Sequence, residues 1–271
     1  MKKSSWKYLW LILLVAGLFV VACDDDTTEP ADQGPDIPPL STFRMDFDTF
    51  PDTSSTAGLE VQSYDNWGWS ALNVAVWNLV ITVHGAVPVA AYIESFNHIP
   101  QQQGDGSWVW TYSVTVGADT YTAELHCSTD AQGLNWEMYL SKAGEFTDFL
   151  WYEGQNNLLY THGTWTLYKA PDDPVEYIGI EWNRNLDDGT ADIRYTNIES
   201  GAPGEGGYIF YGTTTDADYD AFYEIYIIEQ MHNIDIDWNL STHVGRVMDE
   251  IHFGDALWHC WDENLEDIAC N

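Results

Sequence analysis

The chain has 271 residues, with 43 Asp and Glu against 9 Lys and Arg, which gives a formal net charge of −34. Hydrophobic residues make up 45% of the chain and aromatic residues 15%, which excludes a mainly disordered protein. The shortage of cations excludes a general nucleic-acid-binding protein, because phosphate contacts need clustered Lys and Arg. The length fits one large all-β domain or two smaller domains.

The N-terminus has the layout of a secretory signal. Three lysines within the first seven residues precede an apolar run from Tyr8 to Ala22, and Cys23 follows it. A basic start, a short apolar stretch and a small residue at the cleavage site are typical of signal peptides. Residues 20–23, VVAC, resemble the lipobox of bacterial lipoproteins, and this resemblance implies cleavage before Cys23 and acylation of that cysteine. The alternative is a membrane-spanning helix, for which the run is short.

Acids, prolines and threonines dominate residues 24–42, which contain almost nothing apolar. Such a segment cannot bury enough surface to fold. We therefore expect a signal peptide over 1–22, an acidic tether over 23–42 and one folded domain over 43–271. The acids after Cys23 resemble an inner-membrane retention signal in some bacteria and a surface-export signal in others. We expect an envelope lipoprotein, held by its acyl group, at the outer membrane or cell surface rather than the inner membrane.

From Phe43 onward, apolar and polar residues alternate repeatedly. Phe43, Met45 and Phe47 share one face of a first expected strand, and Trp108, Trp110 and Tyr112 share one face of the clearest strand. This period of two predicts strands that are buried on one face. Turn residues recur every 10 to 14 positions or so, which predicts an antiparallel meander of about 11–13 strands. The fold class is therefore mainly β, with some helix (α+β).

Residues 70–96 break this alternation, because they are apolar on nearly every side and contain one charged residue, Glu94. Asp65, Asn66 or Ser70 provides a possible helix cap, and Pro88 is expected to kink or divide the helix. A helix that is apolar all round belongs in a protein core or in a bilayer. We expect the core, with the following residues packed on the sheet: Leu72, Val76, Leu79, Val80 and Val83.

About twelve strands would enclose a lumen wider than an eight-stranded barrel, and this lumen must be filled. The helical segment 70–96 is the expected filling of a closed or partly open barrel. The alternative is a curved open sheet covered by the same segment. That arrangement resembles, at the level of fold alone, the carriers that move bacterial lipoproteins between membranes.

Tryptophans on the inward face of the expected strands are the candidate ligand-binding residues of the barrel interior. They are Trp108, Trp110, Trp136, Trp165, Trp182 and Trp238.

The four cysteines fit an exported protein. Cys260 and Cys270 enclose a short acidic stretch, and in an oxidising compartment we expect them to form a disulfide. Cys127 lies on an apolar face and is expected to be a buried free thiol. The alternative is a zinc site formed by the cysteines with His252 or His259, but the chain lacks the usual ligand spacings.

One acidic loop has a metal-like pattern. Asp216, Asp218 and Asp220 are spaced as in a calcium loop, but Ala221 and Ile227 replace the Gly and Glu that the pattern requires. A polar turn is the expected structure, with calcium as the alternative, and the sequence implies no other cofactor.

No catalytic motif such as GxSxG, HExxH or a Walker loop occurs in the chain. Carboxylate pairs near tryptophans leave a glycoside hydrolase-like enzyme as a minor alternative. The sequence favours a non-enzymatic binding protein, monomeric, for a hydrophobic or glycan ligand. The alternative is a structural or protein-interaction lipoprotein that has an acidic surface and no internal ligand.

Overall fold

The structure is a computed structural model that describes residues 34–51 and 65–270. The described residues belong to one compact unit that begins at Gly34. The expected signal peptide, the acylated Cys23 and the first part of the tether lie outside the described residues.

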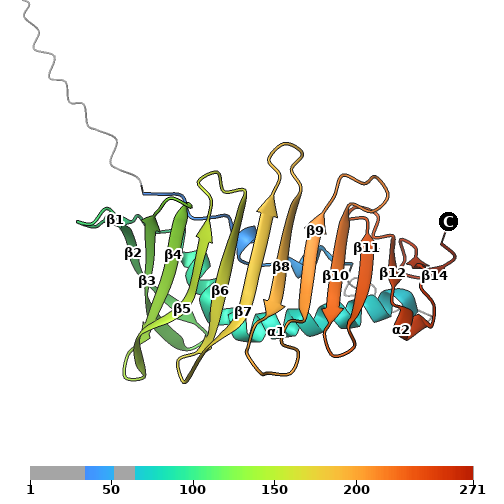
Figure 1. Cartoon of the computed structure of the whole chain (residues 1–271), viewed down its shortest axis with the longest axis horizontal. Coiled ribbons are helices and arrows are strands. Elements are labelled where there is room, and N and C mark those ends of the chain that lie inside the picture. The colour runs from blue at the N-terminus through green and yellow to red at the C-terminus, as the bar shows by residue number, and fades with distance from the viewer. Residues whose placement is uncertain (1–33, 52–64, 271) are drawn as a thin grey trace, which may run out of the picture. The chain divides into compact units, whose positions relative to one another are not determined.

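One antiparallel sheet dominates the unit, and its fourteen strands follow one another in chain order without a crossover (Figure 1). Each strand pairs with the next, and the sheet is open because β1 and β14 are its edges. This confirms the predicted meander and the partly open form of the barrel. The strands are β1 (Gln101–Gln102), β2 (Trp108–Val116), β3 (Asp119–Thr129), β4 (Leu134–Lys142), β5 (Phe146–Asn156), β6 (His162–Ala170), β7 (Asp173–Arg184), β8 (Ala191–Asn197), β9 (Tyr208–Thr213), β10 (Ala221–Ile227), β11 (His232–Trp238), β12 (Gly245–Met248), β13 (His259–Trp261) and β14 (Asp267–Ile268).

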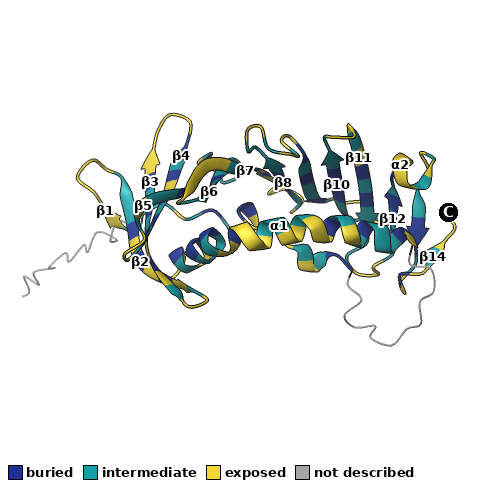
Figure 2. Cartoon of the chain, turned by 90° about the horizontal axis from the view of Figure 1, so that it is seen from below, coloured by how far each residue is buried: buried dark blue, intermediate teal, exposed yellow. Residues whose placement is uncertain are grey.

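The main helix, α1 (Asp65–Ser95), extends across the sheet from β12–β14 to β2 (Figure 2). Pro88 lies inside this helix and does not divide it. At the start of α1, the Asn66 side-chain amide donates to the Cys260 carbonyl over 2.9 Å. Near its end, the Tyr112 hydroxyl donates to the Ala91 carbonyl over 2.6 Å. Hydrogen bonds therefore fasten both ends of α1 to the sheet. The shorter helices are α2 (Glu250–Phe253), η1 (Leu40–Thr42) and η2 (Phe47–Thr49).

Alternation along the strands produces the buried inner face. In β2, Trp110, Tyr112 and Val114 are buried while the residues between them are exposed. Several inner tryptophans lie over a glycine of the neighbouring strand: a Cβ on Gly154 would lie 2.2 Å from the Trp165 ring, and the two residues are paired in register. Glycine at this position thus leaves room for the indole.

The inner face is covered first by residues 34–51, which we call the inner segment. Phe43 is stacked on Tyr92 of α1, with ring centroids 4.3 Å apart, and meets the edge of Trp165 at 5.5 Å. Phe50 meets the edge of Trp238 at 5.1 Å. The inner segment therefore joins α1 to both halves of the sheet, and it supplies the filling that the sequence assigned to residues 70–96 alone.

Local turns and side chains from the sheet, not a strand ladder, satisfy the polar backbone of the inner segment. The Tyr195 hydroxyl donates to the Phe43 carbonyl over 2.7 Å and accepts from the Met45 amide over 2.9 Å. The Trp238 indole donates to the Thr49 carbonyl over 3.2 Å. Buried backbone groups need such partners, so these aromatic side chains bury apolar surface and hold the segment at the same time.

Two details of the N-terminal region differ from the sequence prediction. The alternation of Phe43, Met45 and Phe47 does not form a strand, because this segment packs across the sheet and contains the turns η1 and η2. The compact unit also includes residues 34–42, which were expected to be tether: Thr42 is buried, and the Tyr92 hydroxyl donates to the Pro38 carbonyl over 2.6 Å.

The predicted packing of α1 is largely wrong. Leu72, Val76, Leu79 and Val83 are 57%, 56%, 65% and 62% exposed, whereas Val80 is half-buried. The buried side of α1 consists instead of Asn66, Ser70, Val74, Gly85, Pro88, Ala91, Tyr92 and Ser95. The all-round apolar composition of the helix did not reveal which side would meet the sheet.

These contacts predict opposite outcomes for two truncations. Phe43→Ala should lower the free energy of unfolding by about 3–5 kcal/mol, because it removes a fully buried ring. Leu79→Ala should change it by less than about 0.5 kcal/mol, since this side chain is exposed. Urea unfolding of both variants tests this expectation, and equal losses would show that the positions of the two side chains are wrong.

Candidate functional site

Two grooves lie beside the middle of α1, one on each side of the helix. The helix is fastened at its two ends, and between them the inner segment separates part of the helix from the sheet. The larger opening, called the large groove, has a volume of about 380 Å³. The smaller opening, called the small groove, has a volume of about 270 Å³.

The large groove is mainly apolar and aromatic. Val76, Trp77 and Val80 form its α1 side. The opposite side comes from β7, from the end of β10 and from the loops that follow β8 and β10. These sheet-side residues are Tyr177, Ile178, Asn197, Pro203, Gly204, Gly207, Tyr226, Ile227, Ile228 and Glu229. Apolar walls with a few polar groups are typical of small-molecule sites.

Tyr177 links the large groove to α1 and to a charged pair. Its ring lies 4.8 Å from the His84 ring of α1, and its hydroxyl lies 3.5 Å from His84 Nδ1. The Lys169 ammonium lies 5.8 Å from the Tyr177 ring centroid and 2.6 Å from Glu199 Oε1. Burial raises the pKa of Tyr177, and the nearby Glu199 carboxylate adds to that effect. Tyr177 therefore presents a neutral hydroxyl beside an apolar wall.

The loop between β8 and β9 shapes one wall of the large groove. Gly204 has a φ of +79°, a conformation that side-chain-bearing residues rarely adopt. The Asn197 side chain donates to the Pro203 carbonyl over 3.2 Å and accepts from the Glu199 amide over 3.0 Å. These contacts hold the loop in place, so the polar atoms of Asn197 are already engaged and leave this wall mainly apolar.

The small groove lies between α1 and residues Arg44, Met45, Asp46, Phe47 and Asp48 of the inner segment. Apart from Arg44, each Lys and Arg among the described residues has a side-chain hydrogen bond or ion pair. These residues are Lys142, Lys169, Arg184, Arg194 and Arg246. Arg44 has no such partner in the described ranges, but two aspartates share its groove. The small groove therefore has a mixed rim, unlike the large groove.

The tryptophans expected to bind a ligand inside the barrel are mostly packed core residues. Trp110, Trp136, Trp165, Trp182 and Trp238 are each at most 2% exposed, and Trp108 is half-buried. The interior that they face is occupied by the inner segment and by their aromatic neighbours. Trp136 and Trp182 also border openings on the outer side of the sheet.

The largest of these outer openings, about 630 Å³, is polar and extends over β3–β6. Glu137 and Glu153 lie opposite each other in register, and His126 lies opposite Glu137. The Tyr168 hydroxyl donates to Glu153 over 2.9 Å. Carboxylates, amides and threonines dominate this surface, so its chemistry suits a glycan rather than a hydrophobic ligand.

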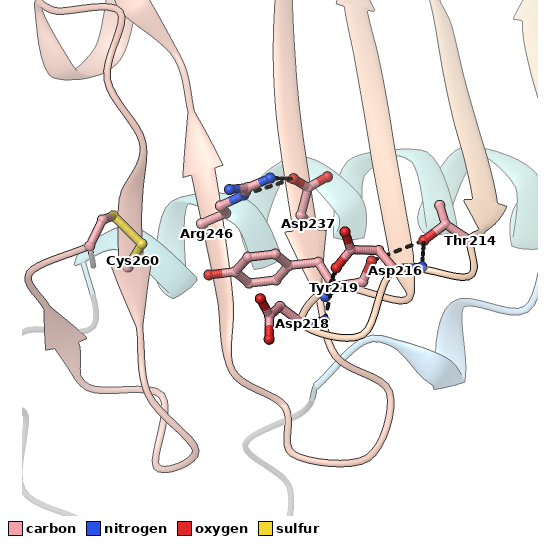
Figure 3. A network of polar contacts seen from close by, with 8 residues as sticks. Thr214, Asp216, Asp218, Tyr219, Asp237, Arg246 and Cys260 are labelled. Atoms are coloured by element: carbon pink, nitrogen blue, oxygen red, sulfur yellow. Dashed lines mark hydrogen bonds and ion pairs between the residues drawn. A yellow bond between two sulfur atoms is a disulfide. The ribbon is translucent and has the colours of Figure 1, made fainter.

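Two aspartates of the calcium-like loop, Asp216 and Asp220, accept hydrogen bonds from backbone amides. Figure 3 shows Asp216 with these contacts, beside Asp218. Asp216 Oδ1 accepts from the amides of Asp218 and Tyr219, over 2.8 and 2.9 Å. Asp220 accepts from the Leu240 amide over 2.7 Å. Within residues 34–51 and 65–270, no group of three or more His, Cys, Asp or Glu side chains is placed to hold a metal ion. The hydrogen bonds of Asp216 and Asp220 to backbone amides hold this loop as a polar turn between β9 and β10.

Next to this loop, Arg246 of β12 contacts Asp237 of β11 and two aromatic rings. Its guanidinium forms an ion pair of 2.7 Å with Asp237. The guanidinium carbon lies 4.3 Å from the Tyr219 ring and 4.1 Å from the Trp258 ring. Figure 3 shows Asp237, Arg246 and Tyr219 as one network. With its charge paired and its faces covered, Arg246 has a structural role.

Cys260 and Cys270 form the predicted disulfide, and Cys127 is the predicted buried free thiol. Burial raises the pKa of Cys127 to about 12. The alternative zinc site is wrong, because both of its C-terminal cysteines are in the disulfide. The proposed histidine ligands are stacked on rings instead: His252 on Trp69 and His259 on Phe253, each at 3.8 Å.

Sequence patterns did not indicate the large groove, because its walls come from four separate parts of the chain. The signal that the sequence offered was the nearly charge-free, apolar composition of residues 70–96, which placed the helix in the core but did not distinguish its two sides. Sequence patterns did not single out Arg44 either, since its lack of a side-chain partner among the described residues depends on the folded chain.

No protein-family model matches this chain, and no curated protein or solved structure matches it either.

A carboxyl group on the outer face gives a pH prediction. Burial raises the pKa of Asp235 to about 6, and Glu224, its partner in register on β10, adds to the shift. The folded state therefore binds this proton more tightly than the unfolded state, whose pKa is near 3.9. This stabilising contribution is complete below about pH 4 and is lost as the pH rises past about 6.

Asp235→Asn should remove this dependence. The free energy of unfolding of the variant minus that of the wild type should be more positive at pH 7 than at pH 4. Urea unfolding of both proteins at the two pH values measures this difference. A constant difference between the two proteins across this range would contradict the raised pKa of Asp235.

Proposed function

We propose that this protein is a non-enzymatic binding protein for a hydrophobic ligand, which it holds in the large groove beside α1. One observation carries the proposal: this opening of about 380 Å³ has walls made mainly of apolar and aromatic side chains. Its volume lies within the range of known ligand pockets, about 300–1,000 Å³. In a chain with a net charge of −34, such a surface is a marked departure from the acidic remainder.

The geometry favours an elongated apolar ligand lying along the helix. Val76, Trp77 and Val80 span more than one helical turn on the groove wall, so they contact a chain-like ligand at successive positions. The Tyr177 hydroxyl and the Glu229 carboxylate supply the polar contacts. An acyl chain or a similar hydrocarbon fits this arrangement better than a compact polar molecule.

We further propose that the protein is an envelope lipoprotein, anchored in a membrane through an acyl group on Cys23. The basic start, the apolar run and the VVAC sequence support this proposal. The Cys260–Cys270 disulfide is consistent with an oxidising compartment outside the cytoplasm. Acylation would place the large groove near a source of hydrocarbon chains, at the outer membrane or the cell surface.

The second candidate function is glycan binding on the outer face of the sheet. The polar opening of about 630 Å³ with Glu137, Glu153 and His126 favours it. A structural or protein-interaction role for the acidic surface is the remaining alternative.

A fluorescent fatty acid tests the hydrophobic site. A dansyl-labelled fatty acid should bind with saturable fluorescence enhancement, and Val80→Trp should weaken binding at least about tenfold by filling the large groove. The matched control is Leu186→Trp, which changes a residue 61% exposed in the loop between β7 and β8. Tyr177 of the large groove lies near the start of β7, whereas Leu186 follows the end of that strand. This control should therefore bind the probe as the wild type does. Equal affinities for Val80→Trp and the wild type would reject the site.

Mass spectrometry of the protein purified from a bacterial envelope tests the anchor. The N-terminal peptide should begin at Cys23 and carry acyl groups. An intact residue 1–22 segment, or a cleaved but unmodified Cys23, would reject the lipoprotein proposal without affecting the proposed groove.

A further inference from the structure

The outward side of α1 carries a continuous apolar stripe. Leu72, Val76, Leu79 and Val83 are spaced by four, three and four residues, which places them on one side of a helix. Each is more than half exposed, and exposed residues extend along the outward side of α1 in Figure 2. A row of four large apolar side chains in solvent is unusual on a monomeric protein and marks a contact surface.

The stripe is free of charge throughout. Between Asp65 and Glu94, α1 contains no Asp, Glu, Lys or Arg. By length and composition α1 could cross a membrane, but its polar fastenings to the sheet at Asn66 and Ala91 hold it along the protein. Such a helix presents to its surroundings an apolar side about 17 Å long between Leu72 and Val83, at a rise of about 1.5 Å per residue.

Exposed apolar side chains also occur on elements that adjoin α1. Ile251 of α2 is 58% exposed, and α2 adjoins the start of α1 because His252 is stacked on Trp69. Met231 is 80% exposed in the turn after β10, and Ile228 of the same turn lines the large groove with Val76. Exposed apolar side chains therefore occur both on α1 and on the elements beside it.

We propose that the apolar stripe of α1 docks on the surface of an uncharged lipid bilayer, with the helix axis in the membrane plane. Burial of these side chains among lipid headgroups and acyl chains would supply the attraction. Because Val76 belongs to both the stripe and the large groove, docking would open that groove toward the lipid.

The position of the N-terminus agrees with this orientation. A Cβ on Gly34 would lie 2.8 Å from Pro100 and from Trp108, so the described chain begins close to the C-terminal end of α1. The chain from Cys23 to Gly34 comprises eleven residue-to-residue steps and spans at most about 40 Å. An acyl group on Cys23 would therefore keep α1 within reach of the bilayer. This last argument rests on the proposed acylation, whereas the exposed stripe does not.

A second copy of the chain fits the stripe less well. The valine and leucine spacing also suits a helix pair, but each copy carries a net charge of −34. Pairing would bring two such bodies within about a Debye length, 8 Å at physiological salt. An uncharged lipid surface imposes no such repulsion, and for the same reason anionic lipid should weaken docking.

Vesicle flotation tests the proposal with residues 34–271, the compact unit, which lacks Cys23 and so removes any contribution from acylation. The protein should float with phosphatidylcholine vesicles. Leu79→Asp combined with Val83→Asp should reduce the bound fraction at least about tenfold, while Leu186→Asp should leave it unchanged. Circular dichroism and unfolding midpoints should show that all variants are folded, as expected for exposed positions.

Three results would overturn the docking proposal. The first is a wild type that does not float, and the second is binding that strengthens when anionic lipid is added. The third is a dimer in size-exclusion chromatography with light scattering that Leu79→Asp dissociates, which would assign the stripe to a second copy. None of these depends on whether Cys23 is acylated or whether the large groove holds a fatty acid.

Discussion

The sheet does not close into a barrel, so other parts of the chain must cover its apolar face. The rest of the structure depends on this constraint. The strands place large aromatic side chains on one face, and the edges β1 and β14 do not meet. The cover comes from α1 and from the inner segment, whose Phe43 and Phe50 contact aromatic rings in both halves of the sheet. Local turns satisfy part of the backbone of the inner segment, and hydroxyl and indole groups from the sheet satisfy further buried groups. Tyr195 is the clearest case, since it bonds both Phe43 and Met45.

The position of the inner segment determines the role of α1. The inner segment packs against α1 through the stacking of Phe43 on Tyr92, while hydrogen bonds fasten the two ends of the helix to the sheet. The side of α1 that faces away from these contacts stays exposed. The same arrangement leaves the large groove beside Val76 and Val80. The proposed ligand site and the proposed lipid contact thus have one structural origin. An acidic protein with an exposed apolar stripe on α1 would have a defined orientation on a membrane.

The sequence predicted those parts of the fold that depend on local pattern. Alternation identified β2 from Trp108 to Val116 and most later strands, and the short spacing of Cys260 and Cys270 identified the disulfide. Sequence prediction failed where one pattern was compatible with two different structures. Phe43, Met45 and Phe47 alternate like a strand, yet they form a segment across the sheet, because tertiary hydrogen bonds replace the ladder. In α1 nearly every residue is apolar, so the pattern did not distinguish the side of Val74, which is buried, from the side of Leu79, which is exposed. Sequence patterns could not predict the large groove, since Val80, Tyr177 and Ile228 become neighbours only after folding.

Native-state hydrogen exchange at the Met45 amide is the most direct test of the central claim, that residues 34–51 belong to the core. This amide donates over 2.9 Å to the buried Tyr195 hydroxyl. If the inner segment is part of the folded core, the Met45 amide should exchange only through global unfolding, with a protection free energy equal to that of the β2–β4 strands. An exchange rate close to that of an unstructured peptide would show that the inner segment is a tether after all, and would contradict the account.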